Sequence, residues 1–315
     1  NNKHAFVEVP LANTIKELWE IVNTSEKFQK HCMMMENVNY GREELMFLNL
    51  CRKGLLGELY HGEAAYIHDL RWQMYEEEIG TGSWRTLQYE KKKGNLYPTH
   101  GLGPVSQYMN LLRTEDTFKT LISFSSPALG REKFARENFK ENHKWNKLNY
   151  QNGDINTTVI KTYLGRTIMV QWDETSPRPY TRLNLIQGTK GILAGGPTRA
   201  AFDNGFEGYT KDAEEWIIGE GIDALYEKYD HPMYKRLHKI TQDSGHGGMD
   251  GMMVYRIIEC LRKGEPLDQN VYEGCAWSSL IELTSNSVNN DGQPQDFPDF
   301  TRGNWVNTNT FDIIP

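Results

Sequence analysis

Three runs near the start of the chain decide the fold: HAFVEVP at residues 4–10, TIKELWEIV at residues 14–22 and CMMM at residues 32–35. The first run is rich in β-branched and aromatic residues and stops at a proline, which is typical of a strand. The second run begins with capping-box spacing and repeats apolar residues on one helical face. The third run is continuously apolar, as in a strand buried on both faces of a parallel sheet. Together the runs predict one strand, helix, strand unit.

A single unit of this kind cannot enclose a hydrophobic core. We therefore expect its parallel neighbours to come from sequence upstream of residue 1. Asn1 leads almost directly into the first strand, without the basic and apolar regions of a signal peptide. From these two features we expect the sequence to be a truncated piece of a longer chain.

The pattern changes after residue 40, because strands then follow one another instead of alternating with helices. Runs of strands predict an open, mostly antiparallel sheet, so the expected fold class is α/β (α+β). The expected strands lie at 59–67, 118–124, 157–164, 167–172 and 182–186, with a tight hairpin at Gly165. The expected helices lie at 42–53, 212–229, 233–240, 249–261 and 272–284, and a polar surface loop is expected at 286–299.

The composition excludes several functional classes. The 315 residues carry a net charge of -7, whereas nucleic-acid binding by bulk electrostatics needs clustered lysine and arginine. No apolar stretch approaches the roughly 20 residues that span a bilayer. The four cysteines are widely spaced and form no CxxC pair, so we expect free thiols and no metal site.

The run YPTHGLGP at residues 97–104 is the most informative candidate site. Gly101 and Gly103 allow backbone conformations that other residues avoid, and Pro104 suits the first turn of the helix that follows. We therefore expect His100 just before a helix N-terminus, where it can position a hydroxyl or accept its proton. A histidine that only ties down a loop is an equally good interpretation of this pattern.

Three further side chains lie beside glycine, proline or other small residues. Tyr66 follows two alanines in an expected strand, and its small neighbours would leave room for a ligand against the ring. Tyr180 stands between a proline and a strand, which is a rigid position for a phenol. His246 lies in a glycine-rich turn and can face the same point as Asp250. For each of the three, a structural role is an equal or simpler interpretation of the local pattern.

Familiar catalytic signatures are absent from the sequence. It contains no G-x-G-x-x-G loop, no Walker sequence, no G-x-S-x-G nucleophile elbow and no H-E-x-x-H pair. Direct glycoside hydrolysis uses two carboxylates at a defined separation, which a sequence does not show. No carboxylate pair stands out here, and this mechanism stays open.

Six motifs nevertheless occur in a characteristic order: EVP at 8–10, MMENVNYGR at 34–42, HGEAAYIHDL at 61–70, NLYPTHGLGPV at 95–105, RPYTR at 178–182 and GHGGMD at 245–250. Their order and spacing resemble glycoside hydrolase family 109, whose known members include bacterial α-N-acetylgalactosaminidases. The resemblance covers nearly all of the chain but lacks the front of the family's nucleotide-binding domain.

The resemblance implies two domains. Residues 1–37 would be the C-terminal remnant of a Rossmann NAD-binding domain, and residues 38–315 would form the substrate-binding α/β domain. In the wider family that includes glucose-fructose oxidoreductase and inositol dehydrogenase, a lysine stands where this chain has Val9. That lysine assists transfer of the hydroxyl proton, so Val9 argues against a simple alcohol dehydrogenase.

The resemblance also implies hydrolysis of terminal α-N-acetylgalactosamine by a redox-assisted elimination with NAD as cofactor. Hydride leaves C3 of the sugar, which acidifies the C2 proton; the glycosidic oxygen is eliminated, water adds and the hydride returns. Such chemistry needs a positioned base and hydrogen-bond donors rather than two matched carboxylates.

The site residues expected on this basis fall into three groups. His100 with Tyr97 would handle the C3 hydroxyl, and Tyr66 or Tyr180 would handle the C2 proton. We assign His100, Tyr180 and Tyr66 to catalysis, Tyr97, Glu36 and His246 to substrate binding, and Glu8, Pro10, Glu36 and Tyr66 to the cofactor.

Two other functions stay open on the sequence alone. An NAD-dependent sugar oxidoreductase of the same fold would need added NAD+ and would accumulate NADH. A carbohydrate-binding fragment without activity is the second alternative, if the natural chain has no phosphate loop. An exposed sheet face or edge would favour a homo-oligomer. The location is open, although the export signals of related bacterial enzymes are compatible with the periplasm.

Overall fold

The structure, a computed structural model, describes residues 2–78 and 84–309. Its first part is a parallel sheet of β1 (Ala5–Val7) and β2 (Cys32–Met34), joined by α1 (Ile15–Phe28). The Thr14 side chain accepts a hydrogen bond from the Glu17 amide and so caps α1. The predicted strand, helix, strand unit is confirmed.

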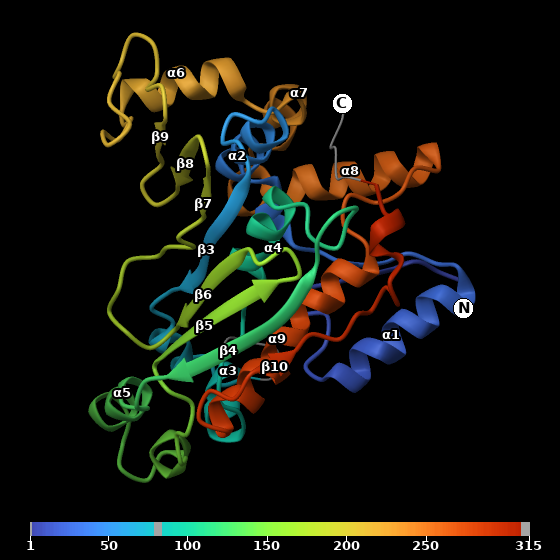
Figure 1. Cartoon of the computed structure of the whole chain (residues 1–315). Coiled ribbons are helices and arrows are strands. Elements are labelled where there is room, and N and C mark those ends of the chain that lie inside the picture. Colours follow the sequence, from blue (N-terminus) through green and yellow to red (C-terminus); the bar gives the residue numbers. More distant parts are fainter. Residues whose placement is uncertain (1, 79–83, 310–315) are drawn as a thin grey trace.

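Within the described residues, the larger sheet has eight strands in the order β10-β4-β5-β6-β3-β7-β8-β9. Only β3 and β6 among these neighbours run parallel, so the predicted open, mostly antiparallel sheet is confirmed (Figure 1). The strands are β3 (Leu59–Ile67), β4 (Phe118–Ser125), β5 (Ile155–Thr162), β6 (Thr167–Asp173), β7 (Leu185–Gly188), β8 (Gly191–Ala194), β9 (Arg199–Phe202) and β10 (Gln295–Asp296).

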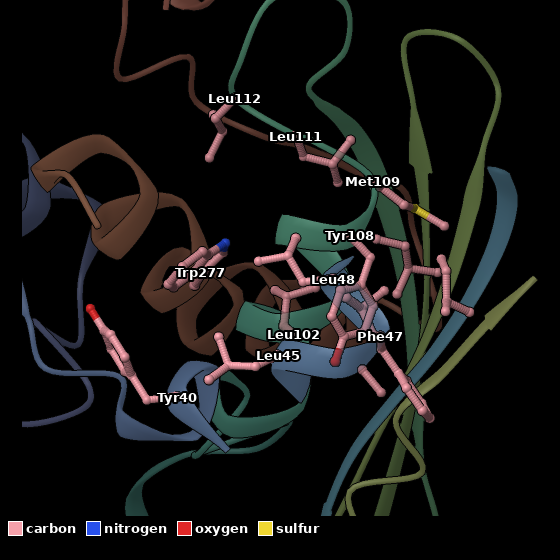
Figure 2. Packing of buried hydrophobic residues seen from close by; sticks show 14 of the residues in the cluster. Tyr40, Leu45, Phe47, Leu48, Leu102, Tyr108, Met109, Leu111, Leu112 and Trp277 are labelled. Atoms are coloured by element: carbon pink, nitrogen blue, oxygen red, sulfur yellow. The ribbon is translucent and has the colours of Figure 1, made fainter. Parts of the chain in front are cut away.

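Helices pack on one face of this sheet. α9 lies against β4, α4 lies against β3, and α1 packs against α9 (Figure 1). Figure 2 shows the core around α2, α4 and α9, where Phe47, Tyr108 and Trp277 are buried together with leucines. The helices are α2 (Arg42–Arg52), α3 (Trp84–Lys91), α4 (Thr99–Tyr108), α5 (Gly130–Asn138), α6 (Glu220–Tyr229), α7 (Pro232–Thr241), α8 (Met249–Lys263) and α9 (Val271–Asn289), with 3-10 helices η1 (Asn37–Tyr40), η2 (Arg71–Tyr75), η3 (Lys144–Lys147), η4 (His246–Gly248) and η5 (Asn304–Asn307).

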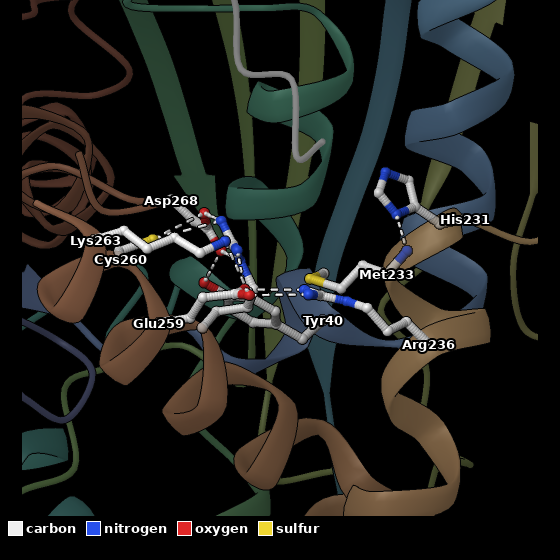
Figure 3. Close-up of polar contacts among 9 residues, drawn as sticks. Tyr40, His231, Met233, Arg236, Glu259, Cys260, Lys263 and Asp268 are labelled. Carbon is white, nitrogen blue, oxygen red and sulfur yellow. Dashed lines mark hydrogen bonds and ion pairs between the residues drawn. The ribbon is translucent and has the colours of Figure 1, made fainter. Parts of the chain in front are cut away.

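A network of charged side chains fixes η1 to the C-terminal helices. The hydroxyl of Tyr40 donates to Oδ2 of Asp268 at 3.1 Å, and Nη2 of Arg256 donates to Oδ1 of the same carboxylate at 2.8 Å. Arg256 also binds Glu259, which pairs with Arg236 on α7 (Figure 3). The network therefore holds the segment after β2 against α8.

Gly101 allows α4 to approach β3 very closely. A β-carbon on Gly101 would lie 2.4 Å from the amide nitrogen and 2.6 Å from the carbonyl oxygen of Ala65, which is closer than van der Waals contact permits. Gly101 and Gly103 have helical backbones, so the unusual conformations expected for them are absent. For Gly101, glycine is required by this close approach instead. The contact places the first turn of α4 on the strand that carries Tyr66.

Several helix boundaries differ from those expected. α4 begins at Thr99, so His100 lies in its first turn rather than before it, and Pro104 lies inside the helix. Contacts with β3 override the low helix propensity of this glycine-rich run. α6 begins only at Glu220, because Gly219 has a left-handed φ of 52°. α9 continues to Asn289, into the segment expected to be a loop.

Some helices and strands were not predicted at all, namely α3, α5, β8, β9 and β10. β7 begins at Leu185 rather than at residue 182, because Leu183 and Asn184 have positive φ angles that a strand does not allow. In the described parts of the chain, no helix combines the length and the apolar character needed to cross a membrane.

Candidate active site

His100 and Glu36 form a buried histidine–carboxylate pair. Nδ1 of His100 lies 2.6 Å from Oε1 of Glu36, and the same oxygen accepts a hydrogen bond from the Val38 amide at 3.2 Å. Glu36 is 0% exposed. The carboxylate therefore favours the tautomer with the proton on Nδ1, which leaves the lone pair of Nε2 available to another partner.

Aromatic rings gather around Tyr66. Its ring centroid lies 4.8 Å from that of Tyr97, 5.5 Å from that of His100 and 6.2 Å from that of Tyr180. His68, two residues further along the chain, lies 5.9 Å from Tyr66 and 5.0 Å from Tyr180. The end of β3, the start of α4 and the segment before β7 thus meet at one point, although they are far apart in sequence.

Two phenols of this cluster are held in the protonated form. Burial, together with the nearby Glu174 carboxylate, raises the pKa of Tyr66 well above its ordinary value. Burial, together with Glu36, raises the pKa of Tyr97 in the same way. Both side chains are therefore hydrogen-bond donors at neutral pH. Arg85 lies beside them, with its guanidinium carbon 5.1 Å from the Tyr97 ring and Nε 3.1 Å from Oε1 of Glu174.

Tyr180 has a different environment. It is 46% exposed, and its hydroxyl oxygen accepts a hydrogen bond from Nη1 of Arg182 at 2.8 Å. Nη2 of Arg182 lies 2.5 Å from Oε1 of Glu44. Burial opposes the charge on Arg182, but Glu44 and Tyr180 together outweigh this effect and the pKa of Arg182 is raised. A permanent cation therefore lies at the Tyr180 oxygen.

His246 and Asp250 form a second histidine–carboxylate pair. Nδ1 of His246 lies 2.7 Å from Oδ2 of Asp250, and Oδ1 of Asp250 accepts a hydrogen bond from Asn37 at 2.7 Å. Partial burial acts to raise the pKa of Asp250, but the hydrogen bonds from His246 and Asn37 outweigh it and lower that pKa. His246 has a φ of 53°, which is uncommon for a residue other than glycine. The two side chains meet as the sequence pattern suggested.

A cavity of about 360 Å³ is lined by both histidines. It lies at the carboxyl ends of the parallel strands β1 and β2, where α/β sheets commonly bind ligands. Oδ1 of Asn37 is buried and has no hydrogen-bond partner among the described residues, so a donor group of a ligand would suit it. The lining residues are Glu8, Val9, Met35, Asn37, Tyr97, His100, His246, Asp250, Met253 and Val254.

The structure brings most of the expected site residues together. Tyr97, His100, His246 and Glu8 line the cavity, and Tyr66 and Tyr180 adjoin it through their ring contacts. Glu36 is not among the residues that line the cavity. It is buried and contacts His100, which lines it. Pro10 follows Val9, which lines the cavity, but Pro10 is not a lining residue.

The sequence did not indicate three neighbours of the site. His68 could have been found from its place two residues after Tyr66, since alternation puts both on one side of an extended chain. Asn37 and Arg85 have no such signal, because their roles depend on partners distant in sequence. Among the described residues, no group of three or more His, Cys, Asp or Glu side chains could hold a metal ion, and the four cysteines are free.

The chain is similar to a known protein family. Residues 40–307 match the family model described as Glycosyl hydrolase 109, C-terminal domain. Glycosyl hydrolase family 109 protein 1 of Akkermansia muciniphila is 62% identical over 313 residues, which cover 99% of this chain and 64% of that protein. A Glycosyl hydrolase family 109 protein of Shewanella putrefaciens is 56% identical over 100% of this chain and 68% of that protein. The chain thus spans about two thirds of the length of these curated relatives.

Solved structures share the fold at low sequence identity. Levoglucosan dehydrogenase in complex with NADH and levoglucosan aligns with a TM-score of 0.67 and 16% identity, covering 94% of this chain and 74% of that chain. An NAD binding oxidoreductase from Klebsiella pneumoniae aligns with a TM-score of 0.66 and 12% identity, with the same coverage. The fold is therefore that of Rossmann-type oxidoreductases.

Proposed function

The chain belongs to glycoside hydrolase family 109, and we propose that it supplies the substrate site of a glycosidase that removes terminal α-N-acetylgalactosamine through transient oxidation at C3. The observation that carries this proposal is the buried pair of His100 and Glu36 beside a cavity at the carboxyl ends of two parallel strands. A base with a free nitrogen then lies next to a site suited to a flat cofactor ring.

NAD is the proposed cofactor. The unpartnered buried oxygen of Asn37 suits the carboxamide of a nicotinamide ring, and Glu8 lines the same cavity directly after β1. Pro10 would fix the end of that strand segment, while Glu36 and Tyr66 would support the cofactor side through His100. Bound NAD would accept a hydride from C3 of the sugar and return it after water has added.

His100 would take the proton of the C3 hydroxyl. Its Nδ1 is engaged with Glu36, so Nε2 is the nitrogen that can accept a proton, and the carboxylate stabilises the imidazolium that forms. Tyr97, whose pKa is raised by burial, would donate a hydrogen bond to a sugar oxygen beside His100. Glu36 acts through His100 and is a positioning residue.

We assign the C2 proton to Tyr180 rather than to Tyr66. A phenol must lose its own proton before it can act as a base, and the raised pKa of Tyr66 disfavours that state. The oxygen of Tyr180 instead accepts a hydrogen bond from the permanent cation of Arg182. A cation at this distance stabilises the negative charge that a base of this kind carries. Tyr66 would then donate a hydrogen bond to the substrate.

The same proposal includes two domains, with residues 1–37 as the end of an NAD-binding domain and residues 38–315 as the substrate-binding domain. A cavity of about 650 Å³ beside β1 and α1 is lined in part by Val7, Ile21 and Phe28. Apolar surface of this kind suits coverage by further elements of a nucleotide-binding sheet.

We also propose that two copies pair through the uncovered face of the larger sheet. Ile122 and Phe124 on β4 and Val159 on the neighbouring β5 are exposed on this face. Light scattering should give a dimer for the unmodified protein and a monomer for Phe124→Lys, because a lysine there would have to be buried unpaired. Equal masses would contradict this pairing.

A direct test of the function uses protein of the full length of the relatives and an aryl α-N-acetylgalactosaminide. A glycosidase of the proposed type releases the aryl alcohol without added cofactor and without net NADH, because the hydride is returned in each cycle. A sugar oxidoreductase would instead require added NAD+ and accumulate NADH absorbance. Release that depends stoichiometrically on added NAD+ would contradict the proposal.

A further inference from the structure

A second cavity, of about 470 Å³, adjoins the candidate active site. His246 lines both cavities, and Tyr180 lines the second one. The walls come from the first turn of α2, the segment before β7, the turn between β8 and β9, the helix α6 and the 3-10 helix η4. A ligand group that extends from the active site past Tyr180 and His246 would therefore enter this second cavity.

The lining offers both hydrogen-bond donors and acceptors. Glu43 accepts hydrogen bonds from Asn184 at 2.7 Å and from Thr198. Arg182 binds Glu44 and Tyr180 through its two terminal nitrogens, while its Nε is buried without a hydrogen-bond partner among the described residues. Ligand hydroxyl groups can both donate and accept, so they can pair with every one of these groups.

Two carboxylates are brought to this cavity by glycines. A β-carbon on Gly41 would lie 2.0 Å from Oε2 of Glu44, and one on Gly195 would lie 2.3 Å from Oε1 of Glu43. Burial, together with the neighbouring Glu44, raises the pKa of Glu43. Arg182, Asn184 and Thr198 already pair with these carboxylates, and the polar atom left without a hydrogen-bond partner among the described residues is the buried Nε of Arg182. A buried donor of this kind at a cavity points to recognition of a polar ligand.

An aromatic ring completes one wall. The guanidinium carbon of Arg42 lies 4.2 Å from the centroid of Tyr226, and Arg42 is held there by Asp230, with Nη2 and Oδ2 2.7 Å apart. Arg42 and Tyr226 both line the cavity beside the polar groups. A lining that combines polar groups with an aromatic ring suits a sugar ring better than an apolar aglycone.

We propose that this second cavity is the subsite for a hexose on the leaving-group side of the glycosidic bond. The inference rests on the proposed function, because it places the terminal sugar over His100 and the next sugar beyond Tyr180 and His246. Substrates with a sugar leaving group would then gain binding that small leaving groups cannot gain.

The test compares two α-N-acetylgalactosaminides, one with galactose and one with fluoride as leaving group. Thr198→Trp should fill the cavity and lower kcat/KM for the galactose substrate at least tenfold, while kcat/KM for the fluoride changes less than twofold. Lys190→Trp, in the turn between β7 and β8 and outside this lining, is the matched control and should change neither value. Arg42→Ala, which opens the cavity rather than filling it, should raise KM for the galactose substrate alone.

Equal effects of Thr198→Trp on both substrates, or no effect on either, would overturn the subsite. If the unmodified protein cleaves neither substrate, the proposed function fails instead. The subsite is then tested by saturation-transfer NMR with methyl β-galactoside. A signal that is present in the unmodified protein and in Lys190→Trp but lost in Thr198→Trp would support the subsite, and absence of a signal in the unmodified protein would overturn it.

Discussion

The two histidine–carboxylate pairs of the site have nearly the same hydrogen-bond length and very different surroundings. Nδ1 lies 2.6 Å from the carboxylate in the pair of His100 and Glu36, and 2.7 Å in the pair of His246 and Asp250. The exposed fractions of the side chains are 15% and 0% in the first pair, and 67% and 36% in the second. The first pair joins α4 to the segment after β2, and the second joins η4 to the first turn of α8.

This difference suggests a division of roles. A buried carboxylate acts on its histidine through a medium of low dielectric constant, so it controls the tautomer and stabilises the charged ring strongly. An exposed pair is screened by water and contributes little beyond orientation. We therefore expect the first pair to govern the chemical step and the second pair to govern substrate binding.

The largest effect is expected from His100→Ala. Removing the proposed base should lower kcat for an aryl α-N-acetylgalactosaminide by about a thousandfold, within the range typical of general acid–base catalysis. Circular dichroism would check that the variant is folded. Normal turnover by a folded His100→Ala protein would refute the assignment of His100.

Glu36→Gln should have the next largest effect. Glutamine keeps the size of the side chain and can still accept the Val38 amide, but it cannot stabilise an imidazolium by charge. We expect kcat to fall by about a hundredfold with KM changed less than threefold, because Glu36 does not touch the substrate. A rise in KM with unchanged kcat would mean that Glu36 acts on binding and that the contrast between the pairs is wrong.

His246→Ala should have a smaller effect, mainly on KM. Loss of one hydrogen bond to the sugar corresponds to about a tenfold increase in KM, with kcat reduced less than threefold. His238→Ala on α7 is a histidine control outside both cavities and should behave as the unmodified protein. A kcat loss as large as that of His100→Ala would make the two pairs equivalent in function.

The smallest expected effect is on the stability of the protein at low pH, through the pair of His246 and Asp250. Because the pKa of Asp250 is lowered in the folded state, its contribution to stability is present above the unfolded pKa of about 3.9 and is lost as the pH falls through the folded pKa. Urea unfolding should therefore show a difference between the unmodified protein and Asp250→Asn at pH 7 that shrinks at pH 3. A difference that grows at low pH would contradict the lowered pKa.

The sequence predicted helices and strands best where a regular hydrophobic pattern ends at residues that interrupt secondary structure. The strand expected at 59–67 coincides with β3, although only its first part alternates in burial and its last four residues are all buried. The start of α4 could not be predicted, because Gly101 and Gly103 disfavour a helix locally and only the contact with β3 overrides them. The segment 212–219 was expected to be helical from its periodicity, but the left-handed Gly219 separates it from α6.

The residues of the candidate site could likewise be predicted from the sequence only in part. Tyr97, His100, Tyr180 and His246 stood out because glycine or proline brackets them in the sequence. Arg85 had no such bracket, and its partner Glu174 is 89 residues away. Pairings over such separations depend on the order of strands in the sheet, which local patterns do not determine.

The contact between Gly101 and Ala65 means that main-chain atoms, rather than side chains, set the spacing between His100 and Tyr66. A contact between side chains shifts when neighbouring residues are exchanged, whereas two peptide groups in contact act as a rigid stop. The reaction centre therefore has the stiffness of the central sheet. Substitutions elsewhere in the core can lower the melting temperature while leaving the alignment of base and substrate unchanged, and a single methyl group at position 101 would disturb that alignment without touching the sugar.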